Sequence, residues 1–337
     1  MFLLTDLDYH VFEIPYQSGF RRIRILSGYA SSAFLMHILT NYPDLEIELI
    51  IGMARTGGIN RWDHIRYQEI AYSNQMITIS YQRETPGIHT KIYHWDDPFG
   101  GNSITFIGSA NFSWNGFRDQ NELLAQVDYP NIEDVFDVAE TIDCRDSNVE
   151  NYIRFFSLRG RRVITALTGP QTSRVQLEME IPNGEDVDTI TLNDLDFVDL
   201  PLLTNNDTSI QETAGLNWGQ RPGRNTNEAY IPVSTTFNRH NPNFFPPLEQ
   251  AFTILTDDGE QLICKMAQQN RKAIQTTENN SIMGRYFRER LGVAYGARVD
   301  VQDVLNYSRT SVRIYKIDSE TYFMDYGIAG SALTEVW

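Results

Sequence analysis

Ile88-His89-Thr90-Lys91-Ile92-Tyr93, followed further along the chain by Gly108-Ser109-Ala110-Asn111, is the stretch that decides how this sequence is interpreted. Apolar and polar residues alternate over 88–93, which predicts a strand with His89 and Lys91 on the same side. The Gly-Ser-Ala-Asn turn ends a second predicted strand, 104–107, and would bring a hydroxyl and an amide to the same edge. Lysine, serine and asparagine can hold the oxygens of a phosphate while a neutral histidine nitrogen attacks phosphorus. The pattern therefore predicts a site for phosphodiester chemistry that needs no metal ion.

These residues resemble the signature of the phospholipase D superfamily, which reads H-x-K, four residues, Asp, and then G-S-x-N or G-S-x-x-N. Asp96 also follows Lys91 at the spacing that the signature asks for. The stretch between Asp96 and Gly108 is longer than usual because of an inserted turn, 97–101, and this departure puts the role of Asp96 in doubt. The residues that fit the signature and are the candidate catalytic residues are His89, Lys91, Ser109 and Asn111.

Asn121-Glu122-Leu123-Leu124 opens a further predicted strand, where nucleases of the superfamily often carry a carboxylate. The resemblance therefore implies that Glu122 orients His89 through its second ring nitrogen. It also implies that one histidine forms a phosphohistidine, while a second protonates the leaving group and later activates water. The chain has no second H-x-K, so we expect a homodimer with one central site, built from His89 and Lys91 of both copies. No cofactor or divalent ion is expected.

The composition is that of a globular protein with enough chain for two domains. The sequence has 337 residues, 41% of them hydrophobic. Its apolar stretches are too short to span a membrane, and the first residues lack the positive region of a signal peptide. Cys144 and Cys264 are isolated, without the spacing of a metal or redox site. We therefore expect a cytoplasmic protein with no membrane association.

Strand and helix signals alternate in the first half of the chain. This order predicts an α/β domain, 1–175, with a mainly parallel sheet and helices on both faces. A run of acidic residues and prolines without Lys or Arg then predicts an acidic linker, 176–204. Short strand signals dominate 205–337, which predicts a mostly-β domain built on a small barrel. The expected elements are strands 22–26, 45–51, 76–81, 121–127, 229–233, 251–256, 261–267, 311–317 and 321–324, helices 31–39, 63–71, 132–143 and 280–291, and a hairpin turn at 257–260.

The second half resembles the B-three DNA-binding pseudobarrel of plant transcription factors, which also occurs in restriction endonucleases. The resemblance rests on Tyr230-Ile231-Pro232, the hairpin 255–265, the helix 281–290 and the run 296–299. A phospholipase-D-like domain followed by such a pseudobarrel is similar to the NgoFVII-type restriction endonucleases. The resemblance implies a sequence-specific, type II-like cut in double-stranded DNA and a cognate DNA methyltransferase. It leaves open whether a separate ATP-dependent translocase subunit takes part.

The net charge of −16 would oppose DNA binding if it were spread evenly, but residues 221–316 contain 13 basic and 9 acidic residues. Local fields attract a polyanion, so this half can bind DNA. The resemblance implies two arms that read the major groove, at 217–228 and 268–278. Arginine pairs with guanine, asparagine or glutamine with adenine, and glutamate with cytosine, while other cations hold phosphates. The candidates are Arg221, Arg224, Asn225, Asn227 and Glu228 in the first arm, and Gln268, Gln269, Asn270, Arg271 and Lys272 in the second, the last two as phosphate anchors.

Two other functions stay open. A lipid phosphodiesterase or phosphatidyltransferase of the superfamily would use the same chemistry, but would be expected to carry a membrane anchor and usually two motifs in one chain. A non-catalytic DNA-binding regulator would use the front domain only to dimerise, and the four motif residues argue against it. Incubation with plasmid DNA distinguishes all three.

Overall fold

The computed structural model describes residues 2–96, 101, 103–165, 172–183 and 186–328. The chain divides into two compact units. The N-terminal unit comprises Met1–Ser157 and Glu180–Asp188, and the C-terminal unit comprises Leu158–Met179 and Thr189–Trp337. The inserted turn at 97–101 lies, apart from Gly101, outside the described residues.

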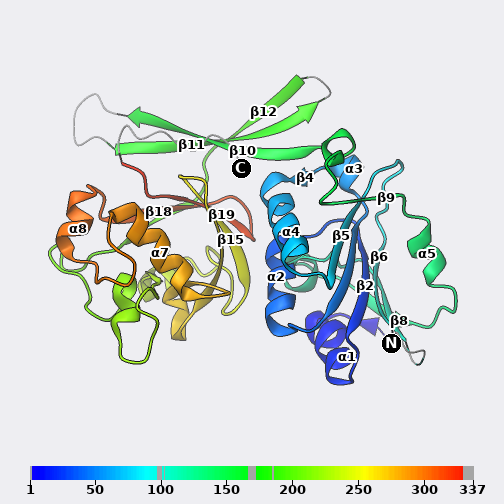
Figure 1. Cartoon of the computed structure of the whole chain (residues 1–337). Coiled ribbons are helices and arrows are strands. Elements are labelled where there is room, and N and C mark those ends of the chain that lie inside the picture. Colours follow the sequence, from blue (N-terminus) through cyan, green and yellow to red (C-terminus); the bar gives the residue numbers. More distant parts are fainter. Residues whose placement is uncertain (1, 97–100, 102, 166–171, 184–185, 329–337) are drawn as a thin grey trace. The chain divides into compact units, whose positions relative to one another are not determined.

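The N-terminal unit is built on a sheet whose described residues form eight strands in the order β1-β8-β7-β6-β2-β3-β5-β9 (Figure 1). Two of these pairs, β2 with β3 and β3 with β5, are parallel, and the other pairs are antiparallel. The α/β class is confirmed, but the sheet is mixed rather than mainly parallel. The strands are β1 (Phe2–Leu3), β2 (Arg22–Ser27), β3 (Glu46–Ile51), β5 (Ile77–Gln82), β6 (Lys91–Asp96), β7 (Ile104–Gly108), β8 (Leu124–Val127) and β9 (Thr141–Asp143).

Helices cover both faces of this sheet, as predicted. Figure 1 shows α2 (Ser32–Asn41) and α4 (Arg61–Ser73) on one side and α5 (Glu133–Asp137) on the other. Phe136 of α5 packs on Leu26, Ile50 and Ile92 of the sheet. The opposite face buries an aromatic cluster in which Phe34 of α2 contacts Phe12, Phe112 and Phe117. The shorter elements are η1 (Tyr9–Glu13), α1 (Ile14–Gln17), α3 (Ala54–Gly57), β4 (Ile59–Asn60), η2 (Asn115–Asp119) and η3 (Val149–Asn151).

Three local predictions in this unit were wrong in their bounds. The strand expected over 121–127 begins only at Leu124, so Glu122 lies in the loop before β8. The motif strand was expected over 88–93, but β6 begins at Lys91, so His89 lies in the preceding loop. The backbone N–H of Ile88 already donates to Gly52 at 2.8 Å, which holds that loop away from the ladder. The helix expected over 132–143 ends at Asp137, and Thr141–Asp143 pairs with β5 instead. Pairing with a sheet edge overrode the local helical pattern.

Strands occupy much of the segment that the composition predicted to be an acidic linker. β10 (Phe155–Thr165), β11 (Thr172–Asn183) and β12 (Asp186–Leu192) form a sheet with β4 in the order β12-β11-β10-β4, and β13 (Phe197–Pro201) follows. The sequence carried the signal, because apolar residues alternate at 175, 177, 179 and 181. The surrounding acidic residues favoured the linker interpretation.

The C-terminal unit contains a sheet whose described strands run in the order β13-β18-β19-β15-β16-β17-β14. Its end strands β13 and β14 contact each other, so the sheet is nearly closed, as a pseudobarrel requires. The predicted strands 251–256 and 261–267 and the turn between them are confirmed as one hairpin. The strands are β14 (Ile231–Pro232), β15 (Ala251–Thr256), β16 (Gln261–Ala267), β17 (Ala273–Thr276), β18 (Ser311–Lys316) and β19 (Thr321–Asp325), and the helices are η4 (Gly215–Gln220), α6 (Thr235–His240), η5 (Gln269–Arg271), α7 (Asn280–Leu291) and α8 (Val301–Asn306).

Helix α7 has the bounds that the sequence predicted. The side chain of Asn279 accepts a hydrogen bond from the N–H of Ser281, and Gly292 ends the helix with a φ of 68°, which glycine adopts without strain. Met283 and Phe287 fill the core of the barrel. In the described part of the chain, no helix has the length and apolar character that crossing a membrane would need.

Candidate active site and nucleic-acid interface

Lys91 and His89 contact each other at the start of β6. The Nζ atom of Lys91 lies 3.0 Å from Nε2 of His89 and donates to the carbonyl oxygen of His89 at 2.8 Å. His89 is exposed, whereas Lys91 is only 3% exposed. Burial lowers the pKa of the Lys91 ammonium, and the nearby Glu122 carboxylate opposes that shift in part. A cation is therefore held at low exposure beside an accessible imidazole.

Gly28, directly after β2, is the point at which three motif side chains meet. A Cβ at this position would lie 2.9 Å from Cδ2 of His89, 3.3 Å from Oδ1 of Asn111 and 3.3 Å from Nζ of Lys91. The Asn111 oxygen accepts a hydrogen bond from the N–H of Tyr29 at 3.1 Å. Because its oxygen is engaged by the backbone, Asn111 can present its NH₂ group to an oxygen of a ligand.

Ser109 and Glu122 form a pair beside this group. The Ser109 hydroxyl donates to the Glu122 carboxylate and accepts from the N–H of Leu123 at 3.1 Å. The sequence predicted that Glu122 would orient His89, but in the described residues no hydrogen bond joins the two. His89 Nε2 instead contacts Lys91, since His89 precedes the strand. Antiparallel pairing of Lys91 with Gly108 brings the Ser109 turn to the same edge of the sheet as Lys91.

Asp96 lies at the opposite end of β6 from Lys91. Asp96 is five positions along the strand from Lys91, a distance of about 17 Å, and it pairs with Arg22 at 3.1 Å. In the part of the chain that the structure describes, one group has ligand atoms close enough for a metal ion: His94, Asp96 and Glu133, all within 4.8 Å of one another. Its carboxylates also pair with Arg22 and Arg24, so it forms an ion-pair network far from His89.

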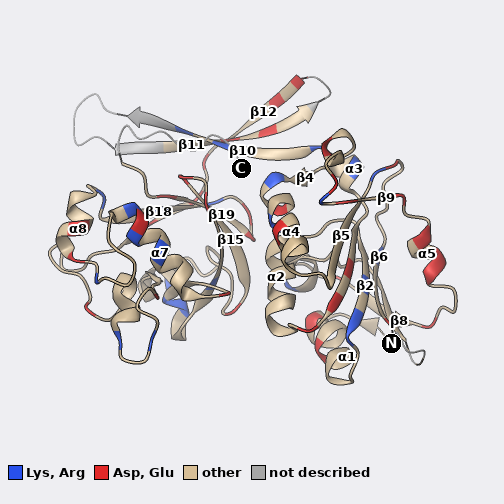
Figure 2. Cartoon of the chain, in the orientation of Figure 1, with Lys and Arg blue, Asp and Glu red and all other residues tan. Residues whose placement is uncertain are grey.

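The first predicted DNA-reading arm begins in η4 and continues as a loop that carries basic residues (Figure 2). The guanidinium of Arg224 stacks over Trp218, 3.7 Å from the ring centroid, and pairs with Glu228 at 2.6 Å. Arg221 is exposed, and its Nε donates to the carbonyl oxygen of Thr213 at 2.7 Å. Arg224 and Glu228 therefore present their polar groups as one pair.

Asn225 and Asn227 use their side-chain oxygens in contacts with backbone N–H groups. Asn225 Oδ1 accepts from the N–H of Asn227 at 3.0 Å, and Asn227 Oδ1 accepts from the N–H of Gly296 at 2.6 Å. Arg288, which is fully buried, donates to the carbonyl oxygens of Thr226 and Asn227 and fixes the base of the loop. An asparagine that reads adenine needs both its oxygen and its NH₂ group, so these contacts would have to break first.

The second arm has an unusual backbone. Gln268, Asn270 and Arg271 have φ values of 61°, 64° and 53°, a region that non-glycine residues rarely adopt. Arg271 donates to the carbonyl oxygens of Pro242, Phe245 and Pro246, whereas Gln269 and Lys272 are exposed. The sequence did not single out the cavity beside this arm, because three of its five lining residues come from α6, which lies far from the arm in the sequence. The cavity has about 400 Å³ and is lined by Thr235, Asn238, Arg239, Asn270 and Arg271.

Comparisons with known proteins agree with both halves of the sequence interpretation. Residues 5–151 match the NgoFVII restriction endonuclease N-terminal PLD domain, and residues 191–318 match the NgoFVII C-terminal B3-like DNA-binding domain. No curated protein matches the chain.

Solved structures resemble the chain only in part. The polyphosphate kinase of Porphyromonas gingivalis matches at 15% identity with a TM-score of 0.29, over 41% of this chain and 22% of the kinase. NucT from Helicobacter pylori matches at 16% identity with a TM-score of 0.29, over 42% of this chain and 92% of NucT.

The two domain matches come from one family and follow each other in its order along the chain. They correspond to the phospholipase-D-like fold that holds the histidine, lysine and asparagine of the motif, and to the nearly closed barrel behind it. The chain belongs to the NgoFVII restriction endonucleases, deoxyribonucleases that join an N-terminal phospholipase-D-like domain to a C-terminal B3-like DNA-binding domain.

Proposed function

We propose that this protein cuts double-stranded DNA at specific sequences, without a metal ion, through a phosphohistidine formed in a pocket that two copies share. The observation that carries the proposal is the convergence of His89, Lys91 and Asn111 around Gly28. A nucleophile, a cation and an amide donor meet there in a space that only a glycine leaves open. The B3-like half of the chain supports DNA as the substrate.

The first step forms a phosphorus–nitrogen bond. The Nε2 atom of His89 attacks phosphorus, and the bond from phosphorus to the leaving deoxyribose oxygen breaks. That oxygen takes a proton from His89 of the second copy. Lys91 and the Asn111 NH₂ group stabilise the charge on the non-bridging oxygens as it develops.

The second step releases the phosphate. The second copy's His89, now neutral, takes a proton from water, whose oxygen attacks phosphorus as the bond to His89 breaks. Ser109 lies beside this group and can donate to a phosphate oxygen once it leaves Glu122. Glu122 then acts as a positioning residue for the Ser109 hydroxyl rather than for the imidazole.

Exposed apolar side chains at this edge support the shared pocket. Ile107 and Leu123 are 37% and 39% exposed, and they flank Ser109 and its partner Glu122. Apolar residues beside a polar site are typical of the core of a protein interface. A two-fold axis at this edge would bring the two His89 side chains into one pocket and cover both residues.

Recognition would be the task of the two arms of the C-terminal unit. Arg221 and the Arg224–Glu228 pair are the base-reading candidates with exposed or half-buried polar groups, and Gln268, Gln269 and Asn270 are those of the second arm. Asn225 and Asn227 would join them after their side-chain oxygens release the N–H groups of Asn227 and Gly296. Lys272 would hold phosphate, whereas Arg271 would first hold the arm in shape.

The cellular setting follows from this activity. Both cysteines are buried free thiols, which is compatible with a reducing cytoplasm. A sequence-specific nuclease there needs a cognate methyltransferase to protect host DNA, and an ATP-dependent translocase is a further candidate partner. We therefore propose a cytoplasmic location, a partner methyltransferase and a partner translocase.

A plasmid digest tests the function. The purified chain with EDTA should cut plasmid DNA, and sequencing of the new ends should give one recurrent sequence context. His89→Ala should cut nothing. Release of headgroups from phosphatidylcholine vesicles, with plasmid left intact, would instead favour a lipid phosphodiesterase. Specific binding without any cleavage, also in the presence of ATP and a translocase, would favour a regulator.

A further inference from the structure

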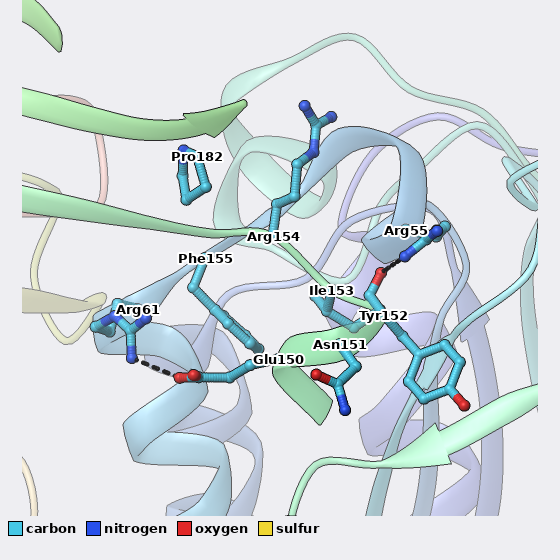
Figure 3. A pocket seen from close by; sticks show the side chains of 9 residues that line it. All are labelled: Arg55, Arg61, Glu150, Asn151, Tyr152, Ile153, Arg154, Phe155 and Pro182. Carbon is cyan, nitrogen blue, oxygen red and sulfur yellow. Dashed lines mark hydrogen bonds and ion pairs between the residues drawn. The ribbon is translucent and has the colours of Figure 1, made fainter. Parts of the chain in front are cut away.

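The N-terminal unit contains a cavity lined by arginines, separate from the site at His89. It has a volume of about 520 Å³ and lies where β4 pairs in parallel with the start of β10. Figure 3 shows Arg61 and Glu150 on one side, Arg55 on the other, and Arg154 with Pro182 above them. The lining therefore carries three positive charges and one negative charge.

Two of these arginines keep their charge unneutralised. Arg61 pairs with Glu150 at 3.1 Å. Arg55 donates to the carbonyl oxygen of Tyr152, and Arg154 donates to that of Thr56 at 2.8 Å. In the described residues neither Arg55 nor Arg154 has a carboxylate partner, and both side chains are exposed. Each backbone contact fixes one edge of a guanidinium and leaves further N–H groups for an anion.

A short chain of contacts joins this cavity to His89. The ring of Tyr29 meets the imidazole of His89 edge to face, with centroids 5.9 Å apart. Tyr29 also lies against Gly57, where a Cβ would be 3.0 Å from the ring. Gly57 ends α3, the same single turn that carries Arg55 and Thr56. The cavity and the reacting imidazole are therefore neighbours across one helical turn.

We propose that this cavity binds the phosphodiester backbone of the strand being cut, at a phosphate that flanks the one attacked by His89. The inference rests on the proposed function. Arg55 and Arg154 would contact the flanking phosphate, and Tyr29, which is 42% exposed, would support the nucleotide between the two phosphates. Arginine forks suit phosphate oxygens, and two fixed points would hold the scissile phosphate in line with Nε2.

The experiment compares two substrates with the full-length protein. Plasmid DNA spans both sites, whereas bis(p-nitrophenyl) phosphate is a single diester that occupies only the pocket at His89. Replacing both Arg55→Gln and Arg154→Gln should slow plasmid cleavage about 100-fold, mainly through KM. Hydrolysis of the small diester should stay within about twofold of wild type. The salt dependence of DNA binding should become less steep by about one to two phosphate contacts.

Matched variants separate charge from structure. Arg21→Gln removes an exposed charge that pairs with Asp44 before β2, at the other end of that strand from Gly28, and should leave both substrates unaffected. Arg55→Lys with Arg154→Lys keeps the charge and should recover part of the plasmid activity. This pair also shows whether the glutamine variants failed only because they did not fold.

Three results would overturn the inference. They are a glutamine double variant that cuts plasmid like wild type, equal loss on both substrates in folded protein, and tight binding of inorganic phosphate without any effect of the variants on DNA. The last would assign the cavity to a free anion. A wild type that is inactive on both substrates would instead contradict the proposed function.

Discussion

His64 stacks on Phe155, with ring centroids 4.2 Å apart, and its Nδ1 atom lies 2.9 Å from the hydroxyl oxygen of Tyr81. Burial, with a smaller effect of Arg61, lowers the pKa of this imidazole to about 4 from its usual 6.5. Between these values the unfolded chain binds a proton that the folded chain excludes. The free energy of unfolding should therefore fall as the pH drops from about 6.5 to 4, by roughly 3 kcal/mol from this residue.

Urea unfolding at several pH values measures this dependence. His64→Gln keeps a hydrogen-bonding group near Tyr81 but does not titrate, so its stability should vary less over the same range. Equal pH slopes for wild type and variant would show that His64 is not the titrating group.

His89, in the loop before β6, and Asp96, at the far end of β6, should differ sharply in their effect on cleavage. His89→Ala removes the nucleophile and should reduce cleavage by at least about 1,000-fold. Asp96→Asn removes a carboxylate at the far end of the strand and should leave cleavage within a few fold. Rates measured by plasmid nicking in EDTA check both. A strong loss of cleavage in Asp96→Asn with unchanged thermal stability would show that Asp96 does contribute to the active site.

Gly28→Ala tests the space in which the motif residues meet. The new Cβ would lie 2.9 Å from His89 and 3.3 Å from Lys91, so the side chains must move apart. Cleavage should fall about tenfold or more, while binding to a cognate duplex should change little, because Gly28 contacts neither the arms of the C-terminal unit nor Arg55 and Arg154. Parallel cleavage and fluorescence anisotropy assays measure the two. Full activity in the alanine variant would mean that the pocket is formed elsewhere.

Substitutions in the two arms should distinguish an arginine that reads bases from one that stabilises the arm. Arg224→Ala should cost on the order of 1–3 kcal/mol on the cognate duplex and far less on random DNA. Arg271→Ala should lower the Tm, because three carbonyl oxygens lose their donor. Lys272→Ala should leave the Tm unchanged and weaken binding to both kinds of DNA. Equal behaviour of Arg224→Ala on both duplexes would remove Arg224 from the recognition set.

The shared pocket makes a prediction about stoichiometry. The active species should sediment as a dimer, and because one pocket serves two strands, nicked plasmid should accumulate before linear plasmid. Mixing wild type with His89→Ala should give inactive mixed dimers. A fully active monomer in sedimentation would exclude the arrangement.

The sequence predicted most of what is local. The H-x-K and G-S-x-N residues could be named because a short motif is visible within a few positions of the sequence, and α7 was predicted with its bounds. Contacts between distant segments were not predictable. Gly28 and Tyr29 belong to the site only because β2 ends beside β6, and Asn227 is engaged by Gly296, 69 residues away. Acidic residues similarly concealed the alternation in β11.

The contact between Lys91 and His89 also bears on how the protein behaves before it meets DNA. When Nε2 of His89 carries no proton, the Lys91 ammonium 3.0 Å away can donate to it and occupy the lone pair that would attack phosphorus. A phosphate oxygen that binds the Lys91 ammonium breaks this contact and frees the lone pair. Substrate binding would thereby make the imidazole nucleophilic. In the resting chain, reagents that modify histidine should therefore react slowly with His89, and latency of this kind would protect a strong nucleophile from the many small electrophiles of a cell.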